Sequence, residues 1–278
     1  MTASRPADFQ DRSGLLEVPG AVSLHHGGTL GAVQVAWRLA GPAGAPVVAA
    51  IGGISADRNF FPVAPGEYGW WHTLVGPGNP LDTQRSRVLG CDYLGGSGQS
   101  TGPKAGGGAF QPVDSRDQAL LLRLLCDHLG IERLHCIAGA SYGGMVALAF
   151  AGLFPERLRH MLVISAAHRA SPLSTAWRSV QRAAIRDGLA RNDGPSGVRL
   201  ARALAMATYR TRTEFEHRFD GAPRREGDRF VFPVEEYLFA RGDDYARRYV
   251  PEAFLCLSES IDLHRIAPSA LRVPTTLV

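Results

Sequence analysis

The sequence predicts an α/β fold in which a mostly parallel sheet is covered by helices. Short, continuous apolar runs have the length and composition of strands buried on both faces, and they lie at 46–55, 87–96, 133–140 and 158–167. Helical patterns separate the later runs, and a strand–helix–strand order is typical of parallel sheets. The chain has 278 residues, 45% hydrophobic and 20% charged, which suffices for one large core.

The first part of the chain contains the earliest predicted strands. Residues 1–20 are polar, and we expect a flexible N-terminus there. Residues 30–39 alternate between apolar and polar side chains, which predicts a half-buried strand. The apolar run 46–55 ends in glycines and predicts a central strand, and 87–96 predicts another beyond a long loop rich in glycine, proline and tryptophan.

Two helices follow, each placed between predicted strands. Residues 113–131 have apolar residues at helical spacing, with Asp114 or Ser115 as the N-cap and Gly130 at the end. Residues 141–155 predict a second helix, which ends at a proline. The strands 133–140 and 158–167 precede and follow this helix.

The composition changes after residue 169. Alanine and arginine dominate 170–258 and the pattern is helical, so we expect a helical cap inserted into the sheet domain. The segment LRVPTTLV (271–278) begins to resemble one more core strand. The predicted organisation is a flexible terminus (1–20), the first part of the core (21–169), the cap (170–258) and an incomplete return to the core (259–278).

Charge, cysteine usage and hydropathy narrow the classes of function. The net charge is +4, and the arginines are spread along the chain rather than clustered. This distribution argues against nucleic-acid binding and indicates a mildly basic surface. The four cysteines form no CxxC pattern and predict neither a metal site nor disulfides. Without a signal peptide or a long apolar stretch, we expect a cytoplasmic protein with no membrane association.

The pattern Gly139-x-Ser141-x-Gly143, followed by Gly144, predicts a nucleophilic serine. It lies between a predicted strand and a predicted helix, the arrangement called a nucleophile elbow, where glycines avoid clashes with neighbouring strands. The turn places the N–H of Tyr142 at a helix N-terminus, where it can stabilise an oxyanion. A second N–H donor is expected from the glycine turn 52–55.

A serine nucleophile needs a histidine base and an orienting carboxylate. In a fold of this kind they follow the serine in the order acid, then histidine, after the last strands. The segment 271–278 is the strand that should precede the acid, so we expect both residues to lie beyond Val278. His168 and His264 precede that strand, and we interpret His264 as a polar residue near a helix end.

The chain resembles the homoserine O-acyltransferases, the MetX-type branch of the α/β-hydrolase fold, from about residue 45 onward. The segments that carry the resemblance are GWWHTLVGPGNPLDT (69–83), LGGSGQSTGP (94–103), GASYGGMVALAFA (139–151), FPERLRHMLVISAA (154–167), ATYR (207–210) and FPVEEYLFARGDDYARRYVPEAFLCLSESIDLH (232–264). The resemblance implies an α/β-hydrolase fold with a helical cap, truncated here at its C-terminus.

The resemblance also implies a reaction. Ser141 attacks the thioester of acyl-CoA, and L-homoserine then takes the acyl group from the acyl-enzyme in a step of methionine biosynthesis. Tyr142 and Ile54 supply the oxyanion N–H groups, and Arg210 binds the carboxylate of the amino acid. No cofactor is expected beyond acyl-CoA as co-substrate, and the expected assembly is a homodimer. Because the acid and histidine are absent, we expect this chain alone to be inactive and aggregation-prone.

Several alternatives remain open on the sequence alone. The turn Gly52–Ala56 differs from the His-Ala-Leu-Thr-Gly-like turn usual in the family, so acetyl-CoA and succinyl-CoA are both candidate donors. A serine O-acyltransferase, an ester hydrolase and an inactive truncated paralogue are the other candidates. Asp82 and Asp92 are interpreted as turn and structural residues, and Trp70 and Trp71 either line the pocket or pack.

Overall fold

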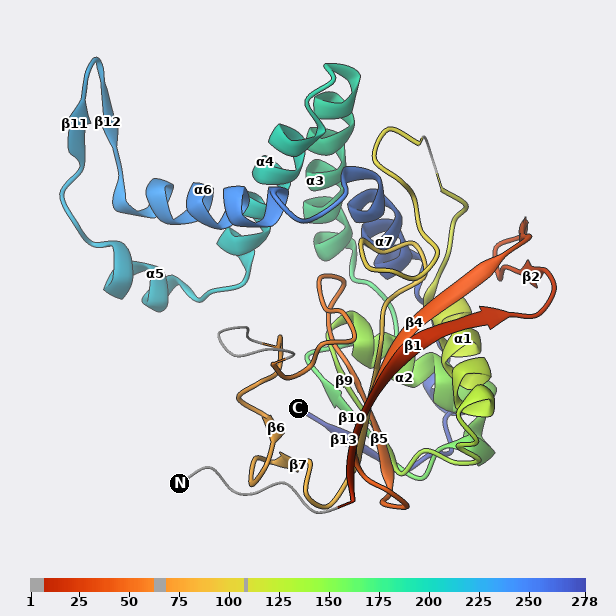
Figure 1. Ribbon diagram of the computed structural model, residues 1–278. Coiled ribbons are helices and arrows are strands. Elements are labelled where there is room, and N and C mark those ends of the chain that lie inside the picture. The colour runs from red at the N-terminus through yellow and green to blue at the C-terminus, as the bar shows by residue number, and fades with distance from the viewer. Residues whose placement is uncertain (1–7, 63–68, 108–109) are drawn as a thin grey trace. The chain divides into compact units, whose positions relative to one another are not determined.

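The computed structural model describes residues 8–62, 69–107 and 110–278. They form two compact units (Figure 1). The sheet unit comprises residues 1–102, 110–170 and 259–278, and the helical unit comprises 103–109 and 171–258.

The sheet unit is built on a sheet of seven strands in its described residues, in the order β1-β4-β8-β5-β9-β10-β13. Neighbours from β8 to β13 pair in parallel, whereas β4 pairs antiparallel with both β1 and β8. The predicted α/β class with a mostly parallel sheet is therefore confirmed. The strands are β1 (Phe9–Val18), β4 (Val33–Pro42), β5 (Val47–Ile51), β8 (Arg87–Cys91), β9 (Cys136–Ala140), β10 (Met161–Ile164) and β13 (Thr275–Leu277).

Two helices connect the central strands as the sequence predicts. Helix α1 (Ser115–His128) begins at Asp114, whose side chain accepts a hydrogen bond from the main chain of Arg116 in a capping box with Asp117. Helix α2 (Tyr142–Leu153) follows Ser141 directly and is buried along most of its length. All five residues of β5 are buried, as its continuous apolar sequence predicts.

Short elements complete the sheet unit. Strands β2 and β3 pair antiparallel, and β6 and β7 pair in parallel. A 3₁₀ turn, η1, follows α2, and a second 3₁₀ turn, η2, precedes β13. Their bounds are β2 (Val22–Ser23), β3 (Thr29–Leu30), β6 (Val75–Gly76), β7 (Leu81–Asp82), η1 (Pro155–Arg157) and η2 (Pro268–Ala270).

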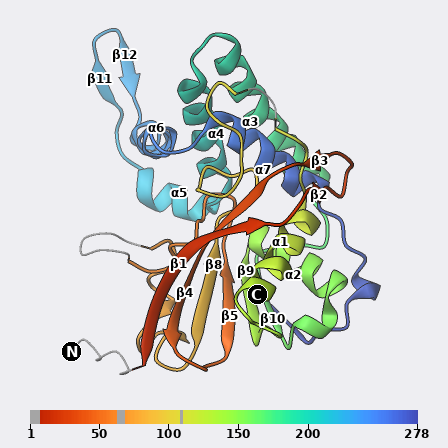
Figure 2. The same ribbon diagram turned by 45° about the vertical axis from the view of Figure 1, so that its right-hand side comes forward.

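The N-terminal segment differs from the flexible one that we expected. Residues 9–18 form β1, which lies along β4 over its full length (Figure 2). Leu16 and Val18 are buried on one face of β1, and Arg38 of β4 forms an ion pair with Asp11. Main-chain pairing thus orders a polar segment whose composition alone suggested a loose chain, because an edge strand exposes many of its side chains. Residues 1–7 lie outside the described residues.

Cys126 is buried in the sheet unit, and Cys91 is partly buried at the end of β8. Burial raises the pKa of the Cys91 and Cys126 thiols to about 12, so both thiols stay protonated at neutral pH. They act as small apolar groups.

The helical unit packs its helices around an apolar cluster. Ile185, Val198 and Phe254 are among the buried members of this cluster. Gly188 and Gly197 let α3 and α4 approach closely, because a Cβ on Gly197 would lie 2.7 Å from the carbonyl oxygen of Ala184. The helices are α3 (Pro172–Ala190), α4 (Gly194–Thr208), α5 (Arg212–Phe219), α6 (Pro233–Ala246) and α7 (Pro251–Leu263), the last of which continues into the sheet unit after Ser258.

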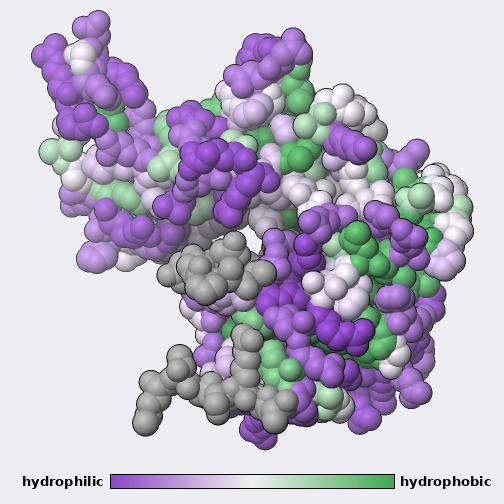
Figure 3. Space-filling view, viewed as in Figure 1, coloured by the Kyte–Doolittle hydropathy of each residue, from purple (hydrophilic) through white to green (hydrophobic). Residues whose placement is uncertain are grey.

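The helical unit also contains elements that the sequence did not predict. Strands β11 (Arg224–Glu226) and β12 (Arg229–Val231) form an antiparallel hairpin that turns at Gly227, with φ of 61°. Its surface is largely hydrophilic (Figure 3), so it carries none of the apolar alternation by which a strand is recognised. The loop 103–107 belongs to this unit as well, since the Gly106 N–H donates to Glu252 Oε1 at 2.8 Å.

The last segment of the chain returns to the sheet. Strand β13 pairs in parallel with β10, with Thr275 opposite Met161. Among the described residues, no helix has both the length and the apolar character that crossing a membrane requires.

Candidate active site

Ser141 occupies a strained corner between β9 and α2. Its φ of 54° and ψ of −119° lie outside the regions that residues other than glycine ordinarily adopt. The Ser141 N–H donates to the Ile164 carbonyl of β10 at 2.8 Å, and its own carbonyl accepts from Gly144 at 2.9 Å. The side chain is exposed. The sequence prediction of a serine raised at a strand-to-helix turn is confirmed.

Glycines permit this corner because the surrounding backbone leaves no room for side chains. A Cβ on Gly139 would lie 2.3 Å from the Gly143 carbonyl oxygen, and a Cβ on Gly143 would lie 2.0 Å from the Ile51 carbonyl oxygen. A Cβ on Gly144 would lie 2.6 Å from the Ala166 side chain. The first two contacts are with the main chain of α2 and β5, which cannot move aside without displacing the helix or the strand.

The glycine turn after β5 lies beside Ser141. A Cβ built on Gly53 would be 3.8 Å from Ser141 Cβ and 4.0 Å from Ser141 Oγ. Tyr142 is the first residue of α2, where main-chain N–H groups point outward from the helix start. The structure thus brings together Ser141, Tyr142 and the turn that contains Ile54. The oxyanion roles of Tyr142 and Ile54 stay predictions.

Two residues at the carboxyl end of β8 hold the glycine turn in place. The Tyr93 hydroxyl donates to the Gly52 carbonyl at 2.5 Å. Asp92 accepts from the main-chain N–H of Arg58 at 2.8 Å and forms an ion pair with its guanidinium. Asp92 is 3% exposed, and its predicted structural role is confirmed. The sequence motifs did not single out Tyr93, because it lies inside the predicted strand 87–96, whereas the observed β8 ends at Cys91.

The two adjacent tryptophans pack beside the same turn. Their rings stack with centroids 4.7 Å apart, and Trp70 Nε1–H donates to the Asp57 carbonyl at 2.8 Å. A Cβ on Gly52 would lie 2.9 Å from the Trp70 ring. Of the two roles that the sequence left open, the structure shows packing for Trp70. Asp82 accepts main-chain hydrogen bonds from Gly78 and Gln84, as a turn residue does.

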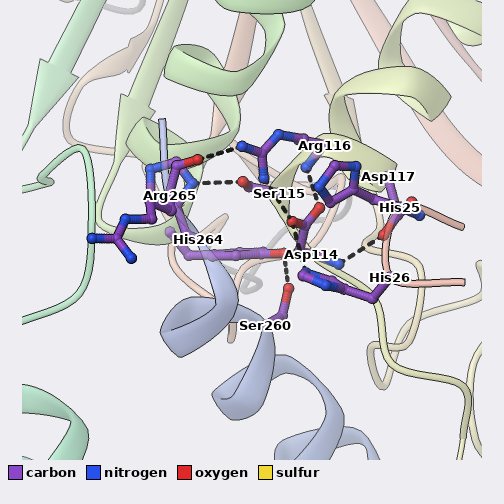
Figure 4. Close-up of polar contacts among 10 residues, drawn as sticks. His25, His26, Asp114, Ser115, Arg116, Asp117, Ser260, His264 and Arg265 are labelled. Atoms are coloured by element: carbon purple, nitrogen blue, oxygen red, sulfur yellow. Dashed lines mark hydrogen bonds and ion pairs between the residues drawn. The ribbon is translucent and has the colours of Figure 1, made fainter. Parts of the chain in front are cut away.

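His264 is an internal residue of the sheet unit. It is 1% exposed, and its Nδ1 lies 2.5 Å from Ser115 Oγ at the start of α1 (Figure 4). Burial lowers the pKa of His264 to about 4, against an attraction from Asp114 that raises it. Within the described residues, no histidine hydrogen-bonds to Ser141. The placement of the base and acid beyond Val278 stays a prediction.

One grouping of metal-ligand types lies near the start of α1. Ligand atoms of His25, His26 and Asp114 all lie within 4.8 Å of one another. However, Asp114 Oδ2 already accepts from the Arg116 guanidinium at 3.1 Å and lies 3.2 Å from His26 Nε2 (Figure 4). A fixed cation on the carboxylate opposes metal binding. The arrangement is better explained as an anchor for the 24–28 turn, since the His25 N–H also donates to Asp117.

Arg210 lies in the helical unit, whereas Ser141 lies in the sheet unit. Its Nε donates to the Tyr237 hydroxyl at 3.0 Å, and its Nη1 pairs with Glu214 one turn along α5. The hydrogen bond to Tyr237 and the charge of Glu214 raise the pKa of Arg210, which stays charged. These partners orient the guanidinium, and its role in binding a carboxylate stays a prediction.

Comparisons with known proteins agree with this geometry. A family model described as the alpha/beta hydrolase fold matches residues 62–252. The chain is 43% identical over 251 residues to a homoserine O-succinyltransferase of Xanthomonas campestris pv. campestris, covering 88% of this chain and 64% of that protein. It is 34% identical to a serine O-succinyltransferase of Litchfieldella anticariensis, covering 92% and 77%.

A solved structure supports the fold. The homoserine O-acetyltransferase of Bacillus anthracis superposes with a TM-score of 0.82 at 18% identity, covering 97% of this chain and 82% of that one. The chain spans only 64% of the length of the Xanthomonas relative.

The glycine contacts give a prediction for two positions of the same helix. Gly143→Ala should destabilise the protein by about 3 kcal/mol or more, because its Cβ would meet the Ile51 carbonyl. Gly152 is exposed, and the nearest contact of a Cβ built on it is Ile266 at 3.9 Å. Gly152→Ala should therefore stabilise the protein by about 0.5–1 kcal/mol. Urea unfolding of both variants measures the difference, and equal effects would contradict the steric argument.

The buried histidine gives a prediction for pH. The folded pKa of about 4 is below the unfolded value of 6.5, so the unfolded chain binds more protons between these values. The free energy of unfolding should therefore fall as pH drops from 7 to 5, by about 1–2 kcal/mol from His264 alone. His264→Gln should remove this contribution. The carboxylates titrate in the wild type and in the variant alike, so the difference between their pH slopes reports His264. Identical pH slopes in urea unfolding would show that burial does not shift this histidine.

Proposed function

Because the chain belongs to the homoserine O-acyltransferase family of the α/β-hydrolase fold, we propose that the protein transfers an acyl group from acyl-CoA to the side-chain hydroxyl of L-homoserine. The reaction passes through an acyl ester on Ser141. The observation that carries this proposal is the exposed Ser141 at a strained corner, with the start of α2 and the 52–55 turn beside it.

The first half-reaction forms the acyl-enzyme. A general base removes the proton from Ser141 Oγ, which attacks the thioester carbon and forms a tetrahedral oxyanion. The N–H groups of Tyr142 and Ile54 stabilise this oxyanion. Collapse breaks the carbon–sulfur bond, and CoA leaves as a thiol after taking the proton.

The second half-reaction repeats these steps with a different nucleophile. The homoserine hydroxyl gives its proton to the base and attacks the acyl-serine carbonyl. The new ester bond forms as the bond to Ser141 Oγ breaks, and Oγ regains a proton. Water in place of homoserine would make the protein an ester hydrolase, so exclusion of water from the acyl-enzyme separates the two activities.

The names of the relatives favour particular substrates. The two relatives compared above by sequence are named succinyltransferases, which favours succinyl-CoA as the donor, whereas the Bacillus protein is named an acetyltransferase, so acetyl-CoA is the second candidate donor. L-Serine is the second candidate acceptor, favoured by the name of the Litchfieldella protein. Serine differs from homoserine by one methylene, which a pocket discriminates by only about 1–3 kcal/mol. We also propose a place in methionine biosynthesis, which follows if homoserine is the acceptor.

The acyl-enzyme provides a direct test. Incubation of protein that carries the predicted base and acid with succinyl-CoA and no acceptor should add one acyl group to the peptide that contains Ser141, as measured by peptide mass spectrometry after acid quench. Ser141→Ala should remove this adduct. Ser165→Ala is the matched control and should leave the adduct unchanged. Ser165 is also an exposed serine with a positive φ (49°), and it directly follows the neighbouring strand β10. An adduct that persists in Ser141→Ala would reject the assignment.

Acceptor specificity is measured on the same acyl-enzyme. L-Homoserine should discharge it faster than L-serine and much faster than water. Faster discharge by serine would identify the second candidate, and discharge by water at the same rate as by either amino acid would identify a hydrolase.

Arg210 gives a prediction for acceptor binding. Arg210→Lys should raise the KM for L-homoserine about 10-fold with little change in the KM for acyl-CoA, because an ammonium cannot form the paired hydrogen bonds of a guanidinium. Arg212→Lys is the matched control, since Arg212 also pairs with a glutamate four residues on and is highly exposed. An unchanged homoserine KM in Arg210→Lys would exclude Arg210 from the acceptor site.

A further inference from the structure

The two proposed oxyanion donors come from segments far apart in the sequence. Tyr142 begins α2, and Ile54 lies in the turn after β5. Hydrogen-bond donors stabilise an oxyanion only when their directions are fixed before the reaction. Some contact between the two segments must therefore set their relative position.

We propose that Tyr93 is a positioning residue that joins the two halves of the oxyanion site. Its hydroxyl holds the turn of Ile54, and its ring packs against the ring of Tyr142. This inference rests on the proposed function and adds a residue that the sequence motifs did not identify.

The hydroxyl of Tyr93 makes a buried hydrogen bond to the turn. It donates to the Gly52 carbonyl at 2.5 Å, and both residues are buried, with Tyr93 5% exposed. Burial raises the pKa of Tyr93 well above its ordinary value, so the donor proton is retained at every working pH. The bond therefore acts as a permanent restraint on the Gly52 carbonyl.

Planar peptides carry this restraint to the N–H groups. In a trans peptide the carbonyl and the following N–H point in opposite directions. With its carbonyl held by Tyr93, the Gly52–Gly53 peptide directs the Gly53 N–H away from Tyr93. The Gly53 carbonyl accepts from the Ala56 N–H at 2.9 Å, which sets the direction of the Ile54 N–H in the same way. Two successive peptide planes next to Ser141 are fixed by these two hydrogen bonds.

The ring of Tyr93 restrains the other half of the site. It meets the Tyr142 ring edge-on, with centroids 5.1 Å apart and an interplanar angle of 62°. Tyr142 is fully buried, and its hydroxyl hydrogen-bonds to Ser260 in the sheet unit. The side chain that begins α2 is thus held between Tyr93 and Ser260.

Tyr93→Phe separates the hydroxyl from the ring, because it keeps the edge-on packing and removes only the donor. We expect the rate constant for acylation of Ser141 by succinyl-CoA to fall about 10- to 100-fold, while the dissociation constant for succinyl-CoA stays within about twofold. A residue needed only for folding would lower the active fraction without changing the rate constant. Hydrogen exchange followed by mass spectrometry should show faster exchange in residues 52–57 than in the wild type.

Tyr245→Phe is the matched control, since it removes the hydroxyl of another buried tyrosine in the core of the helical unit. It should leave the acylation rate constant and the exchange of residues 52–57 unchanged. Wild-type acylation kinetics in Tyr93→Phe would overturn the role of Tyr93 and leave the proposed function standing. Unchanged exchange in residues 52–57 would likewise overturn it. A wild-type protein that carries the predicted base and acid and is never acylated would overturn both proposals.

Discussion

The corner at Ser141 depends on how closely α2 approaches β5. The carbonyl oxygen of Ile51 occupies the space that a side chain on Gly143 would need, with only 2.0 Å between them. This approach brings the first turn of the helix against the turn that leaves β5. It also holds Ser141 at a positive φ that an unsupported chain would abandon, because the cost of such a conformation must be offset by surrounding contacts. Close packing of the α2 main chain against β5 therefore keeps the Ser141 hydroxyl exposed.

Side chains from outside the motif complete this arrangement. Asp92 and Tyr93 directly follow the neighbouring strand β8, and they bond to opposite ends of the segment 52–58. Their positions on a parallel sheet explain why they reach it, since the carboxyl ends of parallel strands meet at one edge. The same edge presents Ser141 after β9. Strand order therefore gathers the residues of the candidate site.

Buried polar groups in the sheet unit fall into two kinds. Some stay neutral and act as donors or acceptors of fixed direction, such as Tyr93 and His264. Others form ion pairs, such as Asp92 with Arg58 and Arg38 with Asp11. Ser141, by contrast, is exposed after β9 on the same edge of the sheet.

The sequence by itself determined the alternation of strands and helices, the start of α1 at Asp114 or Ser115 and the place of Ser141, because these depend on neighbours within a few residues. It did not reveal β1, whose order comes from pairing with β4, or the hydrophilic β11–β12 hairpin. Only the tertiary structure joined Tyr93 to Gly52 and enclosed His264 against Ser115, residues separated by 41 and 149 positions. Contacts over such separations leave no periodic pattern in the chain, since they arise from the order in which strands assemble.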